Sequence, residues 1–267
     1  NDWRKFDITG EDIRRSRRAY FANISYLDDK IGEILEALRG TRQEENTIVL
    51  FLSDHGDMLG ERGLWFKMSF FEGSARVPLM IAAPGLDPRR EETPVSTIDV
   101  TPTLGALAGV DISEIAPWTD GENLVPLARG EGREAPVRIE YAAEGSQAPL
   151  VCLRQDRWKY VHCELDPPQL FDLSADPHEL RNLAEDPAHA EVAAGFAAQV
   201  AALWDMPAFD AEVRESQARR WVVYEALRNG AYYPWDFQPL QKASERYMRN
   251  HMDLNVLEDS QRYPRGE

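Results

Sequence analysis

Apolar residues recur at helical spacing near the start of the chain. Between residues 12 and 39 they mostly stand three or four positions apart, and Gly40 follows the last of them. This period predicts one long amphipathic helix that ends at the glycine. A shorter helix is expected over Thr97–Gly109, because its start carries polar residues that can cap a helix and Pro102 lies in its first turn.

Two short segments between these helices are almost entirely apolar. Ile48–Ser53 and Pro78–Ala83 have the length of strands, and Pro84 and Gly85 end the second one. Unbroken apolar runs are typical of parallel strands covered on both faces. The order helix, strand, strand, helix therefore predicts an α/β fold with half of a doubly wound sheet.

The pattern changes after about residue 133. Four short segments of mixed polarity, separated by turn residues, predict a small antiparallel sheet: Val137–Tyr141, Leu150–Arg154, Trp158–His162 and Gln169–Leu173. The Ala-rich segment Pro187–Trp204 predicts a helix that packs closely against that sheet. We therefore expect a small antiparallel α+β subdomain after the α/β part.

The last sixty or so residues differ again. Ala211–Arg228 has the pattern of a charged amphipathic helix, and the residues that follow are too aromatic for a disordered tail. We expect this C-terminal extension to order against its own domain or a neighbouring subunit. The predicted parts are an α/β core over residues 1–133, the small subdomain over 134–205 and the extension over 206–267.

Composition excludes some classes of function. The 267 residues carry a formal net charge of −16, which argues against a nucleic acid partner because phosphates are neutralised by clustered Lys and Arg. No apolar run reaches about 18 residues, so we expect no membrane span. Cys152 and Cys163 have the spacing of neither a zinc site nor a disulfide framework, which favours a reducing, cytoplasmic location.

Candidate chemistry gathers after the first apolar strand. Asp54 and His55 stand at its carboxyl end, where open α/β sheets bind ligands, and together they could hold a divalent cation. Lys67 follows a loop with two glycines and could place a positive charge on an anionic substrate. The alternatives are that Asp54 caps a turn, and that His55 and Lys67 are ordinary surface residues. Arg76 either touches the substrate or, as we expect, pairs with a buried carboxylate.

Several segments in order resemble the sulfatase family of the alkaline phosphatase superfamily, over nearly the whole chain. Ser53–Gly56 is similar to the family's metal-ligand turn, and Lys67 matches its substrate-binding lysine. The further similar segments are residues 20–32, Ser74–Leu79, Asp99–Leu104, Ala108–Val110 and Leu170–Pro177 with Glu179, Asn182 and Leu183. Gly63–Glu72, Tyr233–Leu240 and Tyr247–Asn255 are similar to the choline sulfatase branch.

The resemblance implies a metal-assisted sulfuric ester hydrolase with a formylglycine nucleophile, made in a Cys-x-Pro-x-Arg context. Neither Cys152 nor Cys163 lies in that context, and the paired aspartates and the upstream histidine of the family are also missing. With its start at Asn1 and no initiating Met, the chain resembles the C-terminal half of such an enzyme. We therefore expect it to have no sulfatase turnover by itself.

The same resemblance implies choline sulfate as substrate, with Asp54 and His55 on the metal and Lys67 on the ester. Ca²⁺ is the expected metal, with Mn²⁺ or Mg²⁺ as alternatives. A quaternary ammonium needs aromatic faces and carboxylates, and the resemblance favours Glu144 and Asp253 for that role. The extension is expected to join copies of the chain in a homo-oligomer. Two other readings stay open: a phosphonate monoester or phosphodiester hydrolase, and a non-catalytic assembly module.

Overall fold

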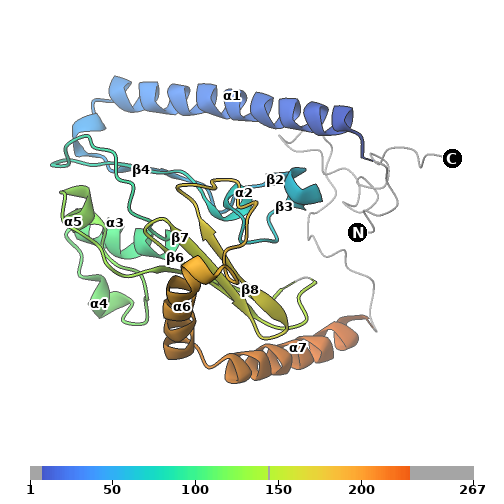
Figure 1. The fold of residues 1–267 in the computed structure, drawn as a ribbon. Coiled ribbons are helices and arrows are strands. Elements are labelled where there is room, and N and C mark those ends of the chain that lie inside the picture. Colours follow the sequence, from blue (N-terminus) through green and yellow to red (C-terminus); the bar gives the residue numbers. More distant parts are fainter. Residues whose placement is uncertain (1–7, 144, 229–267) are drawn as a thin grey trace. The chain divides into compact units, whose positions relative to one another are not determined.

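The computed structural model describes residues 8–143 and 145–228. The chain divides into two compact units, one formed by Ile13–Asp210 and the other by Asn1–Asp12 together with Ala211–Glu267. The first unit contains the small sheets and most of the helices (Figure 1). It also contains every predicted site residue that the structure describes.

The first long helix forms as predicted. Helix α1 runs over Gly10–Gly40, and Thr9 caps it: the Asp12 backbone N–H donates to Thr9 Oγ1, and the Thr9 backbone N–H donates to the Asp12 carboxylate. None of its side chains, all of which the structure describes, is fully buried. Arg17 ties α1 to the following loop through bonds to the Leu59 carbonyl and the Glu61 carboxylate.

The two apolar segments form strands, but their direction differs from the prediction. Strand β1 (Val49–Leu52) pairs with β4 (Leu79–Ala82) antiparallel, with Val49 opposite Ala82. The expectation of parallel strands was wrong because an apolar run does not encode strand direction. A parallel pair needs a long crossover, usually a helix. The described connection between β1 and β4 holds only a short hairpin and one helical turn.

The connection after β1 is built from tight turns. Strands β2 (Met58–Leu59) and β3 (Trp65–Phe66) pair around the 3₁₀ turn η3 (Glu61–Gly63), and helix α2 (Glu72–Ala75) follows. The backbone has positive φ at both loop glycines, Gly60 and Gly63. Glycine adopts this conformation without steric cost, which permits the sharp hairpin that carries the chain towards Lys67.

The second predicted helix forms as a 3₁₀ turn, η4 (Thr97–Asp99), continued by α3 (Val100–Ala108). Ser96 and Asp99 form a capping box at its start, and Gly109 ends it in the left-handed conformation. The short helices α4 (Ile112–Ile115) and α5 (Val125–Ala128) follow.

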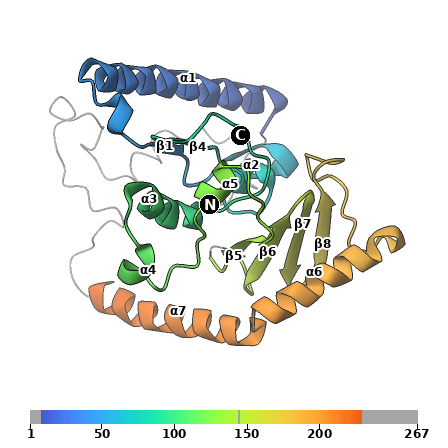
Figure 2. The ribbon, with the colours of Figure 1, turned by 90° about the vertical axis from the view of Figure 1, so that its left-hand side faces the viewer.

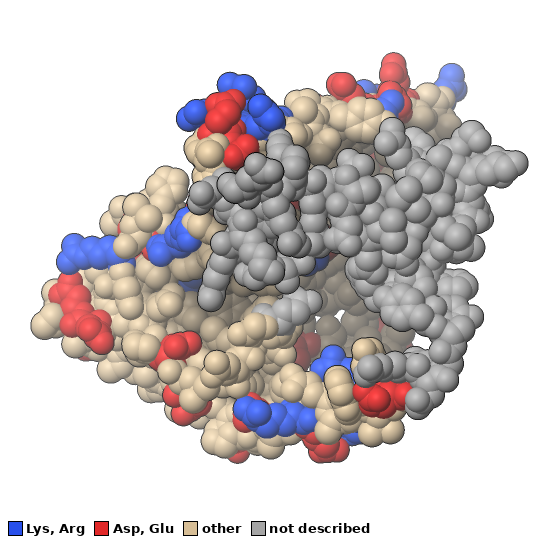
Figure 3. All heavy atoms as spheres, turned by 90° about the vertical axis from the view of Figure 1, so that its right-hand side faces the viewer, with Lys and Arg blue, Asp and Glu red and all other residues tan. Residues whose placement is uncertain are grey.

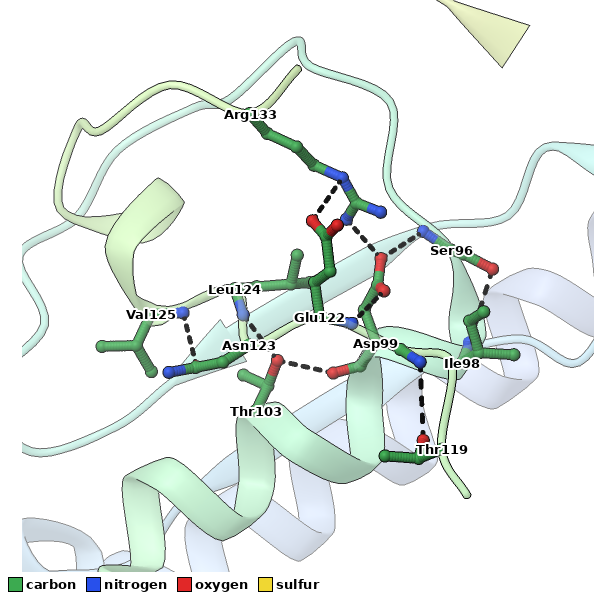
Figure 4. A network of polar contacts seen from close by, with 11 residues as sticks. Ser96, Ile98, Asp99, Thr103, Thr119, Glu122, Asn123, Leu124, Val125 and Arg133 are labelled. Carbon is green, nitrogen blue, oxygen red and sulfur yellow. Dashed lines mark hydrogen bonds and ion pairs between the residues drawn. The ribbon is translucent and has the colours of Figure 1, made fainter. Parts of the chain in front are cut away.

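The Asp99 carboxylate is the centre of a polar network at the start of α3 (Figure 4). It is completely buried and accepts hydrogen bonds from the backbone N–H groups of Ser96 and Glu122, each 2.8 Å long. Arg133 pairs with it at 2.5 Å. The network joins the start of α3 to the segment that leads into the small sheet.

The predicted small antiparallel sheet is confirmed. Its strand order is β5-β6-β7-β8, over Val137–Tyr141, Leu150–Gln155, Trp158–Cys163 and Asp166–Asp172. After the 3₁₀ turn η5 (Pro187–His189), helix α6 (Ala190–Leu203) packs on β6 and β7 (Figure 2). The rings of Tyr160 and Phe196 stack at 5.7 Å between sheet and helix. The main apolar core therefore lies between this sheet and the helix that follows it.

Helix α7 (Met206–Arg228) includes the predicted segment Ala211–Arg228. The part in the second unit exposes Trp221, Val222, Val223 and Tyr224. On the face in Figure 3, acidic and basic side chains of the described residues are interspersed, and no extended basic patch is visible. Of the helices that the structure describes, none is singly long and apolar enough to cross a bilayer; the bent pair Pro187–Leu203 and Met206–Ala226 passes that test by length and composition only.

Candidate active site

Asp54 stands directly after β1 and points into solvent. Its side chain is 83% exposed, and its Oδ1 accepts a 3.0 Å hydrogen bond from the backbone N–H of His55. That bond is the main reason why the pKa of Asp54 lies below its ordinary value, with the charge of Lys67 adding to it. Asp54 therefore presents an ionised carboxylate at the carboxyl end of β1.

The imidazole of His55 is oriented by its own turn. Its Nδ1 lies 2.8 Å from the carbonyl oxygen of Gly56. A carbonyl oxygen only accepts, so Nδ1 carries the proton and Nε2 keeps its lone pair in the neutral ring. This nitrogen lies 3.3 Å from Asp54 Oδ2. The two atoms can therefore face one common ligand.

Lys67 reaches the same point from the far side of the β2–β3 hairpin. Its Nζ lies 2.9 Å from His55 Nε2 and donates to that lone pair. The structure thus brings Asp54, His55 and Lys67 together, although twelve residues separate the lysine from the histidine. The remaining two predicted site residues, Glu144 and Asp253, lie outside the described residues.

The three residues line a cavity of about 1270 Å³ that also contains several arginines. Arg76, Arg138 and Arg154 are among its lining residues. The pKa of Arg154 is lowered, first by burial, although Glu72 nearby opposes the shift. Carboxylates line the same space, among them Glu91, Glu92 and Glu140, so the cavity as a whole is mixed in charge. A positive field that attracts an anion is therefore a local property of the part around Lys67.

Arg76 differs from our expectation. We expected it to pair with a buried carboxylate, but its side chain is exposed and makes no hydrogen bond or ion pair with any residue that the structure describes. It lies immediately after α2, whose cap it forms through its backbone N–H. Its guanidinium is therefore available to the cavity.

Asp54 and His55 suit a divalent cation by their donor atoms, a carboxylate oxygen and an imidazole nitrogen whose tautomer is set by Gly56. The described residues nevertheless include no group of three or more His, Cys, Asp or Glu arranged around one point. The chain therefore presents two donors of a metal site rather than a full set.

A second cavity of about 470 Å³ adjoins the residues after Lys67. Phe70 and Tyr141 both line it and contact each other edge to face, with ring centroids 6.3 Å apart, and Asp166 adds a carboxylate. Tyr141 and Gly145 line it on either side of position 144 in the sequence. We did not predict this pocket; its signal in the sequence was an aromatic residue three positions after the candidate lysine.

Glu140 also lines the larger cavity but already has a partner. Its Oε1 accepts a 2.6 Å hydrogen bond from the indole N–H of Trp204. Glu140 therefore fastens the end of α6 to β5.

Three family models match the chain. They are described as "Sulfatase" over residues 2–110, "N-sulphoglucosamine sulphohydrolase, C-terminal" over residues 60–205 and "Choline sulfatase enzyme C terminal" over residues 211–263. Together they account for nearly the whole sequence, in the order expected along one polypeptide.

Individual relatives agree with these models. A choline-sulfatase of Rhizobium meliloti (strain 1021) is 66% identical over all of this chain and 52% of its own length. Arylsulfatase K of Danio rerio is 40% identical over 66% of this chain and 35% of its own. The crystal structure of the phosphonate monoester hydrolase of Agrobacterium radiobacter superposes with a TM-score of 0.63 at 32% identity, covering 74% of this chain and 42% of that one.

The chain thus spans about half the length, or less, of the relatives it matches. Its mixed α/β architecture is shared with the sulfatase-like solved structures, and the matched models extend from residue 2 to residue 263. The chain belongs to the sulfatase family.

Proposed function

We propose that this chain is part of a choline sulfatase, an enzyme that hydrolyses choline sulfate to choline and sulfate. The observation that carries the proposal is the 2.9 Å contact of Lys67 with His55 beside an ionised Asp54, at a cavity that several arginines also line. The likeness to a choline-sulfatase over the whole chain supports the substrate. The formylglycine nucleophile would come from polypeptide outside these 267 residues.

Asp54 and His55 would hold a divalent metal through the carboxylate and Nε2, with Ca²⁺ preferred and Mn²⁺ or Mg²⁺ as alternatives. When bound, that metal would polarise the sulfate oxygens. His55 Nε2 has a single lone pair, so metal and Lys67 compete for it. Lys67 would then turn its ammonium to the ester, where it stabilises negative charge on the sulfate and the departing oxygen.

The trimethylammonium group would lie in the second cavity. A quaternary ammonium has no N–H to donate, so aromatic faces and nearby carboxylates must recognise it. Phe70 and Tyr141 supply the faces, and we assign the carboxylates to Glu144 and Asp253. The proposal also includes a cytoplasmic location and a homo-oligomer joined through residues 206–267. It keeps the predicted division of the chain after residues 133 and 205.

The test compares choline sulfate with 3,3-dimethylbutyl sulfate, which replaces the cationic nitrogen by carbon. In an active protein that joins this chain to a Cys-x-Pro-x-Arg segment, kcat/KM should favour choline sulfate. Phe70→Leu should reduce this preference about three- to tenfold, because it keeps an apolar side chain but removes the π face. Phe71→Leu is the matched control, since Phe71 lines neither cavity and instead packs on Phe171.

Equal rates on both esters in the unchanged enzyme would refute choline as the recognised group. Faster hydrolysis of a phosphonate monoester than of choline sulfate would instead support the phosphonate hydrolase reading, to which the Agrobacterium structure is similar. The 267-residue chain alone should hydrolyse neither, and turnover by it with added metal would contradict an external nucleophile.

A further inference from the structure

A buried ion cluster of Lys159, Glu72 and Glu179 lies between the candidate site and the small sheet. Lys159 stands on β7 and is 1% exposed. Its Nζ contacts Glu72 Oε1 at 2.5 Å, Glu179 Oε1 at 2.8 Å and the Phe70 carbonyl at 2.8 Å. The contacts with Glu179 and Phe70 are hydrogen bonds and the contact with Glu72 is an ion pair, so two carboxylates balance the buried ammonium.

Glu179 joins this cluster to the backbone of α2. Its second oxygen, Oε2, accepts a 2.8 Å hydrogen bond from the backbone N–H of Glu72, the first residue of the helix. Glu179 is buried and has a φ of 55°. A non-glycine residue in this left-handed region costs free energy, so the surrounding contacts must hold it there.

Helix α2 in turn supports both halves of the candidate site. The buried Ser74 donates its hydroxyl to the Lys67 carbonyl at 2.5 Å. The Ser74 carbonyl accepts a 2.7 Å hydrogen bond from the backbone N–H of Gly56, whose own carbonyl orients His55. One helical turn therefore contacts the lysine loop and the histidine turn at the same time.

We propose that Glu179 and Lys159 are positioning residues that fix α2, and through it the relative placement of His55 and Lys67. This rests on the proposed function only in treating those two residues as site groups. The positioning residues belong to the small subdomain, next to which α2 lies (Figure 1). The subdomain therefore contributes to the geometry of the site as well as to its walls.

The variant Glu179→Gln, which replaces one carboxylate oxygen by an amide nitrogen, tests the positioning role. A glutamine cannot accept from both Lys159 and the Glu72 N–H, because one of its two positions becomes a donor that faces another donor. The matched control is Asp99→Asn, which creates the same conflict in a fully buried carboxylate that accepts backbone N–H groups and pairs with Arg133. No contact described for Asp99 involves α2, Lys67 or the histidine turn. Glu72→Gln is the conservative control, since its amide oxygen can still accept from Lys159.

The readouts are amide hydrogen exchange of Gly56 and the ring ¹⁵N shifts of His55 in the 267-residue chain. We expect Glu179→Gln to raise Gly56 exchange about tenfold or more and to shift His55 away from the Nδ1–H tautomer. Asp99→Asn, compared at equal global stability, should change neither, and Glu72→Gln should change Gly56 exchange less than threefold. If Glu179→Gln does not fold, Glu179→Asp, which keeps the charge but shortens the reach, should give the same changes.

Unchanged exchange and tautomer in the Glu179 variants, or equal changes in the Asp99 control, would overturn the positioning role. Neither readout requires turnover, metal or substrate. A failure here therefore leaves the proposed sulfatase activity standing, and a failure of that activity leaves this inference standing.

Discussion

Arg133 is a side chain whose removal should cost much stability, because its main partner is a buried carboxylate. It pairs with the fully buried Asp99 at 2.5 Å, and its Nε lies 3.3 Å from Glu122 Oε2 (Figure 4). Arg133→Met keeps most of the apolar stem and removes the charge. Asp99 then keeps its hydrogen bonds from the Ser96 and Glu122 backbone but loses its cation.

The two ion pairs contribute very different amounts. Glu122 is half exposed, so its pair with Arg133 is worth at most about 1 kcal/mol. Asp99 is 0% exposed, and leaving one member of a buried ion pair without its partner costs about 3–5 kcal/mol. We therefore expect Arg133→Met to lower the free energy of unfolding by about 3–5 kcal/mol, nearly all of it through Asp99.

Urea unfolding followed by circular dichroism measures this loss, with Glu122→Gln as the control that removes only the exposed pair. The double variant Arg133→Met/Asp99→Asn should be less destabilised than the two single variants together, because it removes both charges. A loss below about 1 kcal/mol for Arg133→Met, or an equal loss for Glu122→Gln, would refute the assignment of Asp99 as the main partner.

Three further predictions concern the thiol, the lysine and the histidine turn. Burial raises the pKa of Cys152 to about 12 from its ordinary 9.0, so native protein should resist thiol labelling at pH 8. Because the thiol pKa is higher in the folded than in the unfolded state, its contribution to the free energy of unfolding is complete below pH 9 and falls by about 1.4 kcal/mol per pH unit from 9 towards 12. Cys152→Ala should reduce this pH dependence in urea titrations, and an unchanged dependence would contradict the buried thiol as its cause. Lys67→Met removes both a charge that repels cations and a competitor for His55 Nε2, so calorimetry should show about tenfold tighter Mn²⁺ binding to the chain. Weaker binding would contradict the competition between Lys67 and the metal. Gly56→Ala would drive its methyl group into the Gly73 carbonyl, so the variant should lose at least about 2 kcal/mol of stability, and a neutral effect in the same urea assay would show that the turn can relax.

Periodic segments were the most predictable part of the fold. Helix α1 and the four strands of the small sheet lie within a few residues of their predicted bounds, because amphipathic period and turn residues are local properties. The pairing direction of β1 and β4 was not predictable in this way. It depends on the connection between them, whose short turns carry little periodic signal.

The candidate site was likewise predictable only where its residues lie in local motifs. Asp54, His55 and Lys67 could be named from sequence because each lies in a recognisable local motif, and the structure brings them into contact. Their roles in metal and substrate binding stay predictions. The positioning roles of Lys159 and Glu179 were not predicted, although Glu179 was noted in a segment similar to the family. Those roles arise only from tertiary contacts across 20 and 107 residues. A lysine in an alternating strand carries no sign that it is buried.

The anchoring of α2 from β7 has a consequence for building chimaeras between family members. A designer who exchanged strands β5–β8 to import a new specificity would also exchange Lys159, and the segment after β8 would carry Glu179 or its replacement. Crossover points placed at the change in sequence pattern near residue 133 would separate these residues from Glu72, their partner on α2. Successful grafts should therefore be those in which Glu72, Lys159 and Glu179 descend from one parent.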